Sequence, residues 1–222
     1  MHAIRLAPTF VEMAIKFPPG ARATFIAAAI SVLVGISGTS RSVTALFTPQ
    51  PVVSAEAGDR TSVAMSQAMD EFATALAEYD RTAERRALTG ANALVSALLF
   101  LAGVHLWRRQ PTAVWWMTQA ALANLLYTGI DVALLLYRIH HSPRFVGALS
   151  RWVNATMTND AAQHGTHPLS LSQVDIVSFA TIAIVVSGVL RGLVYLWLYW
   201  RTRRNDVRAF IAQPRLSEPP PQ

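Results

Sequence analysis

The sequence predicts an all-α integral membrane protein with four transmembrane helices, the second of which extends into an extracytoplasmic amphipathic helix. Apolar residues make up 52% of the 222 residues and charged residues only 14%, whereas a soluble domain usually carries about a quarter charged residues. The apolar residues are gathered into four blocks long enough to cross a bilayer, for which about 20 residues suffice. Basic residues cluster at the block ends, which indicates bilayer orientation and no nucleic-acid partner.

The segment from Asp59 to Arg109 carries the longest helical pattern in the chain. Its apolar residues recur in alternating steps of four and three, which is the helical period. The first part, 59–87, carries charges on its other faces, and the second, 88–109, is uncharged until its last two residues. We expect a helix, capped by Asp59 or Thr61, that is amphipathic outside the membrane and then spans it, forming one rod if it is unbroken. At 1.5 Å per residue it would measure about 75 Å.

The remaining elements follow from the other apolar blocks and the polar stretches between them. Pro111 ends the second span, and the short turn there makes the second and third spans antiparallel neighbours. Residues 145–153 suggest one interfacial turn within an otherwise polar loop, and the last residues, SEPPPQ, have a composition that rarely packs. In chain order we expect an N-terminal segment (1–23), a first span (24–47), an outer segment (48–88), a second span (88–109), a third span (112–137), an outer loop (138–172), a fourth span (174–200) and a basic tail (201–222).

The distribution of basic residues predicts the orientation of the spans. Residues 1–23, 108–111 and 201–222 together hold ten basic residues and three acids, and the opposite side holds seven basic residues and eight acids. The positive-inside rule then places both termini in the cytoplasm, and we expect a cell membrane, the bacterial inner membrane, as the location. Tryptophans enriched at the same predicted interface agree with this orientation: Trp107, Trp115, Trp116, Trp197 and Trp200.

Three charged residues within the apolar blocks are candidate site residues, because charges in a membrane usually face protein or water. Arg41 and Asp131 lie at similar depths below the outer ends of the first and third spans, so we expect an ion pair between them. Its simplest role is to clamp two helices, and one alternative is an ion or proton pathway. The other is that the first span ends near Gly38 and Arg41 is solvated. Arg191 lies deeper in the fourth span, too far from Asp131 to meet it, and is expected to extend toward the cytoplasmic headgroups.

Small residues four positions apart predict close helix packing in two spans. Ser31 and Gly35 provide such a surface on the first span, and Gly188 and Gly192 on the fourth. The apolar stripe of the outer helix is a further candidate interface, either with the chain's own 138–172 segment or with a partner helix. The stripe consists of Met65, Met69, Phe72, Leu76 and Tyr79.

Four histidines share the outer loop, and imidazole is a good zinc or copper ligand. They are His140, His141, His164 and His167. Their spacing matches no strong metal signature, so a solvated loop is the simpler interpretation. The sequence also lacks the G-x-S-x-G, phosphate-loop and nucleotide-binding motifs, and we expect no cofactor.

Three function classes remain open on the sequence. The favoured one is a non-enzymatic accessory or scaffolding subunit, embedded in the lipid bilayer, that associates with itself or with another membrane protein through the outer helix and the fourth span. The second is a small oligomeric channel or transporter that uses Arg41, Asp131 and Arg191. The third is a metal-binding sensor or enzyme that uses the outer histidines.

Overall fold

The computed structural model describes residues 18–47, 63–167 and 170–213 of the chain. Within these ranges the chain forms seven helices and no strand, which confirms the all-α prediction. The helices are α1 (Ala21–Phe47), α2 (Val63–Asp80), α3 (Ala83–Trp107), α4 (Ala113–His141), α5 (Pro143–His164), α6 (Gln173–Thr202) and α7 (Asn205–Ala212).

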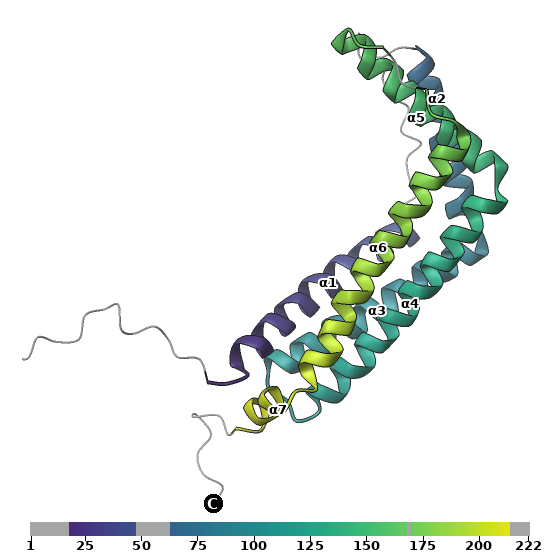
Figure 1. Cartoon of the computed structure of the whole chain (residues 1–222). Coiled ribbons are helices and arrows are strands. Elements are labelled where there is room, and N and C mark those ends of the chain that lie inside the picture. Colours follow the sequence, from purple (N-terminus) through teal and green to yellow (C-terminus); the bar gives the residue numbers. More distant parts are fainter. Residues whose placement is uncertain (1–17, 48–62, 168–169, 214–222) are drawn as a thin grey trace, which may run out of the picture.

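Four long helices form a bundle, and two others project from one end of it (Figure 1). In the bundle, α1 packs against α3, α3 against α4, and α4 against α6, and a smaller contact joins α6 to α1. The projecting pair, α2 and α5, is called the arm. The bundle end where α1 begins and α6 ends is called the termini end, and the opposite end is called the arm end.

The four bundle helices are 27, 25, 29 and 30 residues long and apolar enough to cross a membrane. Many of their large apolar side chains remain exposed on the chain's own surface, Leu33, Leu126 and Phe179 among them. A helix that is apolar on its outer faces is typical of a membrane span, where lipid covers it. The chain is therefore an integral membrane protein, as the sequence predicts.

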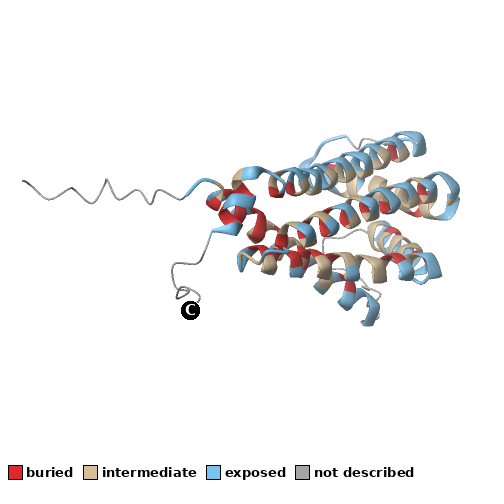
Figure 2. Cartoon of the chain, turned by 90° about the horizontal axis from the view of Figure 1, so that it is seen from below, coloured by how far each residue is buried: buried red, intermediate tan, exposed pale blue. Residues whose placement is uncertain are grey.

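The bundle core lies toward the termini end, where the buried residues gather (Figure 2). It combines alanines of α1 and α4 with a few larger side chains, of which Leu99, Leu106, Met117 and Leu198 are fully buried. The Ser31 hydroxyl group donates to the Ala27 carbonyl and lies 3.5 Å from the Met117 sulfur. Alanine-rich contacts of this kind let the helix backbones approach closely.

Glycines set the closest approach, between α1 and α3. A Cβ atom added to Gly35 would lie 2.6 Å from the Phe100 backbone nitrogen, so no larger residue fits without moving a helix. The predicted packing role of Ser31 and Gly35 is thus realised within the chain. The second predicted pair also faces a helix of this chain, since a Cβ atom on Gly188 would lie 2.4 Å from a Val132 methyl group of α4.

The segment is not one unbroken rod, because the helix breaks between α2 and α3. Thr82 is extended, with φ −64° and ψ 144°, and its hydroxyl oxygen accepts a hydrogen bond from the Arg85 backbone N–H at 3.3 Å. This is the geometry of a helix N-cap. The apolar stripe continues through the break in unchanged register, which is why the periodicity did not reveal it. The predicted start at Asp59 or Thr61 lies outside the described residues.

The predicted outer loop is also wrong over most of its length. Pro143 begins α5 only one residue after α4 ends, and the 22 residues of α5 lie along α2. Phe72 stacks on Trp152 with ring centroids 5.1 Å apart, and Phe145 contacts both Phe72 and Tyr79. The apolar stripe of α2 is therefore covered by the chain's own α5, the first of the two predicted alternatives.

The start of the basic tail forms α7, which the sequence analysis missed. Val207, Phe210 and Ile211 are buried against the termini end of the bundle. Arg109, in the α3–α4 turn, donates to the Phe210 and Gln213 carbonyls at 2.7 and 3.0 Å. A cation placed there also interacts favourably with the carbonyl end of a helix. The SEPPPQ end of the tail lies outside the described residues.

Candidate functional site

A cluster of charges joins the arm to the bundle and is here called the charged junction. Its centre is Asp131 of α4, whose side chain is only 9% exposed. One carboxylate oxygen, Oδ1, lies 3.2 Å from Arg85 Nη1 of α3, and the other, Oδ2, lies 3.6 Å from Arg191 Nη1 of α6. The carboxylate thus ties together three of the four bundle helices.

The end of the arm contributes to the same cluster. Arg85 Nε lies 3.5 Å from the Asp80 carboxylate at the end of α2. The guanidinium carbons of Arg85 and Arg138 lie 5.4 and 4.9 Å from the centre of the Tyr79 ring, within the range of cation–π attraction. Burial raises the pKa of the Tyr79 phenol above its ordinary value, so the ring is neutral at physiological pH. The junction therefore fixes the angle at which the arm leaves the bundle.

The predicted Arg41–Asp131 ion pair does not form. Arg41 is exposed and makes no ion pair within the described part of the chain, because both Asp131 oxygens are taken by other arginines. The physical reason is the order of the helices. Arg41 lies on α1, which packs along α3, whereas Asp131 lies on α4 among residues of α3 and α6.

The prediction that Arg191 cannot reach Asp131 is wrong as well. Backbone positions alone, counted from the ends of the two spans, place the two residues about 15 Å apart along the bundle at 1.5 Å per residue. Helical side chains tilt toward the N-terminus of their own helix. Since α4 and α6 are antiparallel neighbours, Arg191 extends toward the arm end and Asp131 toward the termini end, so the two groups meet.

Arg85, Tyr79, Asp80 and Arg138 were not predicted to belong to the site. The sequence analysis assigned Arg85 and Asp80 to the solvated face of one long helix, and Tyr79 to its apolar stripe. A usable signal was present, since these charges stand where the charged half of the segment meets the uncharged half. A helix break at that boundary brings them beside the third and fourth spans.

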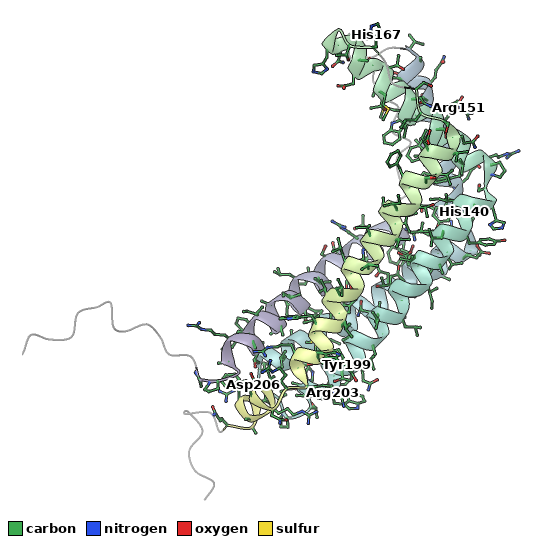
Figure 3. All side chains as sticks on the ribbon, in the orientation of Figure 1. His140, Arg151, His167, Tyr199, Arg203 and Asp206 are labelled. Atoms are coloured by element: carbon green, nitrogen blue, oxygen red, sulfur yellow. The ribbon has the colours of Figure 1, made fainter. Side chains whose placement is uncertain are left out.

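The predicted histidine cluster does not assemble. In the described residues there is no group of three or more His, Cys, Asp or Glu side chains placed to hold a metal ion. His140 stands at the end of α4 and His167 beyond the far end of α5 (Figure 3). His140 and His141 contact backbone carbonyls one turn earlier in their own helix, and His164 lies 3.3 Å from Asp160.

The charged junction is built to hold helices in place. Each oxygen of its buried carboxylate has a guanidinium partner, so neither is directed toward an open space where a substrate atom would sit. Removing one partner of a buried ion pair typically costs about 3–5 kcal/mol, since a charge is left uncompensated. Arg191 differs from the other residues of the charged junction, because its side chain is 58% exposed although it lies within a membrane span.

No family model, curated protein or solved structure matches this chain. The fold and the site together define a helical membrane protein with a projecting arm and a charged junction at its root.

Proposed function

We propose that the protein is a non-enzymatic scaffolding subunit that docks another membrane protein against α6, around Arg191. The observation that carries this proposal is the exposure of the Arg191 guanidinium group within an apolar span. Arg191 lies nine residues before Trp200, or about 14 Å along the helix, near the middle of a hydrocarbon core of about 30 Å. A charged side chain at that depth costs about 3 kcal/mol when lipid surrounds it.

The rest of α6 supports a partner at the same face. In the most apolar stretch of α6 only 6% of the residues are buried within the chain, against 28–33% for the other three spans. Val194, one turn from Arg191, is exposed, as is Leu190. The Gly188 side of the helix is already occupied by α4, so a partner would contact the remaining faces.

Charge complementarity favours a different protein over a second copy of this chain. In a two-fold dimer the same patch lies on both subunits, so Arg191 would face a second Arg191. The nearest carboxylate at this depth, Asp131, already has two guanidinium partners. A transmembrane helix of another protein that carries a carboxylate or a polar acceptor at mid-membrane depth fits the exposed guanidinium better.

The arm would serve the same role outside the membrane. Its aromatic interior is filled by its own two helices, so it offers its partner an outer surface, on which Asp70 and Glu78 are exposed. With the positive-inside orientation, both termini are cytoplasmic and the arm is extracytoplasmic. We propose a cell membrane, the bacterial inner membrane, as the location, with one docking surface in the lipid and another beyond it.

The test is the composition of the complex purified from native membranes in mild detergent. We expect the wild-type protein to have a mass above that of one chain, and Arg191→Gln to lose most of the added mass. Arg41→Gln is the matched control, because it removes an exposed arginine of α1 that makes no ion pair in the described structure. A photo-crosslinker at Val194 should label the same partner, and one at the exposed Leu126 of α4 should not.

Several results would overturn the proposal. A wild-type mass equal to one chain would exclude a stable partner. If Arg41→Gln lost as much of the added mass as Arg191→Gln, the location of Arg191 would not matter for docking. Co-purification of two differently tagged copies through the Val194 crosslink would replace the partner protein with self-association. Unfolding of Arg191→Gln is monitored separately, and Arg191→Lys, which keeps the charge, should retain the complex.

A further inference from the structure

An open cavity of about 920 Å³ lies at the termini end of the bundle, far from the charged junction. The α3–α4 turn, the first turns of α4 and the end of α7 form its walls. Figure 3 shows Tyr199, Arg203 and Asp206 at this end of the molecule, where α6 passes into α7. Beside the cavity, Arg109 joins the turn to the end of α7 by hydrogen bonds to the Phe210 and Gln213 carbonyls.

The lining of this cavity is strongly basic. Of the twelve described residues that line it, four are arginines and none is acidic; the arginines are Arg108, Arg109, Arg203 and Arg208. Their neighbours in the chain, Arg201 and Arg204, share one carboxylate, that of Asp206, at 3.5 Å each. Arg203 and Arg208 are exposed and have no carboxylate partner among the described residues. Among the described residues, Asp206 thus pairs with arginines outside the cavity lining, and Arg203 and Arg208 bring positive charge to the cavity.

Arg203 is also held in place. Its guanidinium carbon lies 5.1 Å from the centre of the Tyr199 ring, and its Nη1 donates a hydrogen bond to the Tyr199 hydroxyl group. A guanidinium group that is oriented by an aromatic ring loses less conformational freedom when it binds an anion. The remaining N–H groups of its fork match the spacing of two phosphate oxygens.

The position of the cavity along the membrane normal indicates where its ligand comes from. Trp115 lines the cavity and is 58% exposed, and Trp107 and Trp200 are exposed at the same end of the bundle. Exposed tryptophans at the ends of spans mark the headgroup level of a bilayer. Pro111, Val114 and Ile211 give the cavity apolar walls beside its arginines.

We propose that this cavity binds a phosphate group, supplied by an anionic phospholipid whose headgroup lies at the same level. Basic pockets between membrane helices at the headgroup level suit such lipids, because Arg pairs with the phosphate while apolar walls accept the glycerol and the first acyl carbons. The same chemistry fits a free phosphate ion, so the experiment separates the two sources. The inference does not depend on the docking of a partner at Arg191.

The experiment is the thermal unfolding of the purified full-length protein in detergent with added ligand. A ligand that binds only the folded state raises Tm, and the rise grows with the ratio of ligand concentration to Kd. We expect phosphatidylglycerol to raise Tm and phosphatidylcholine at the same concentration to leave it nearly unchanged. The double variant Arg203→Gln/Arg208→Gln should lose most of that shift, and the Arg203→Lys/Arg208→Lys variant, which keeps charge but not the planar fork, should retain part of it.

Arg204→Gln is the matched control, since it removes one positive charge from the same tail outside the cavity. It should respond to phosphatidylglycerol like the wild type. Inorganic phosphate and glycerol 3-phosphate form the second arm. A Tm shift with the lipid but not with the phosphate compounds assigns the site to phospholipid. An equal Tm shift with inorganic phosphate that is lost in the double variant assigns the site to free phosphate. An unchanged lipid shift in the double variant, an equal loss in Arg204→Gln, or no shift with any phosphate compound would overturn the proposal.

Discussion

The α1–α3 contact in the bundle and the α2–α5 contact in the arm are both antiparallel helix pairs, yet they are built from opposite kinds of residue. The first uses Gly35, Gly103 and Ser31, whose small size lets the two helix backbones come close. The second uses Phe72, Phe145 and Trp152, whose rings fill the space between the helices. Lipid is as apolar as leucine, so a bundle in lipid gains little from large apolar contacts and depends on close approach. An arm outside the lipid, as proposed above, would gain from the burial of large rings.

This difference predicts opposite responses to side-chain size. Removal of volume should damage the arm, and addition of volume should damage the bundle. The charged junction between the two regions follows neither rule, since it depends on charge balance.

The largest expected effect is at the junction, where Asp131→Ala should lower the free energy of unfolding by about 3–5 kcal/mol, because two guanidinium groups lose their shared carboxylate. Unfolding in detergent, followed by circular dichroism, measures the loss. The double variant Asp131→Ala/Arg191→Gln should recover part of it, since one uncompensated charge is removed. Stability of Asp131→Ala equal to that of the wild type would contradict the assigned role of the carboxylate.

The next effect is in the arm, where Phe72→Ala should destabilise the α2–α5 contact by about 3 kcal/mol through loss of the stacked ring. Hydrogen exchange should accelerate in α2 and α5 while α1 and α3 stay protected. Val63→Ala is the control, because Val63 is 72% exposed on the same helix. Accelerated exchange throughout the bundle would mean that arm and bundle unfold as one unit.

In the bundle, Gly35→Ala should cost about 2 kcal/mol, because the added methyl group meets the Phe100 backbone, which cannot rotate away. Gly90→Ala in α3 is the matched control: no atom lies within 4 Å of a Cβ added there, and alanine is the better helix former. We expect thermal unfolding to separate the two variants in opposite directions. Equal Tm values would remove close approach as the basis of the α1–α3 contact.

The smallest effect concerns the ion pair between Glu71 of α2 and Arg151 of α5 on the surface of the arm. Both side chains are more than half exposed, so Glu71→Gln should cost less than about 1 kcal/mol. The loss should shrink further in 1 M salt, where charges are screened beyond about 3 Å. Protease sensitivity of the arm at low and high salt measures the stability cost of Glu71→Gln. A cost near that of Phe72→Ala would show that the ion pair, and not ring stacking, stabilises the arm.

The sequence alone determined the membrane architecture. The number of spans, their approximate limits and the close packing of Ser31 and Gly35 follow from composition, helical period and residue size, which are local properties of each segment. The aromatic stripe of α2 was also readable, because a helix in water must cover an apolar face, and the 138–172 segment was correctly considered as its cover.

The partners of the charges were decided only by the tertiary structure. Asp131 pairs with Arg85 and Arg191, and not with Arg41, because helix order and the opposite tilt of side chains on antiparallel helices set which groups meet. The break at Thr82 and the burial of α7 were hidden for a related reason. The break leaves the apolar register unchanged. The burial of α7 depends on a contact between Phe210 and Arg109, which are 101 residues apart in the chain.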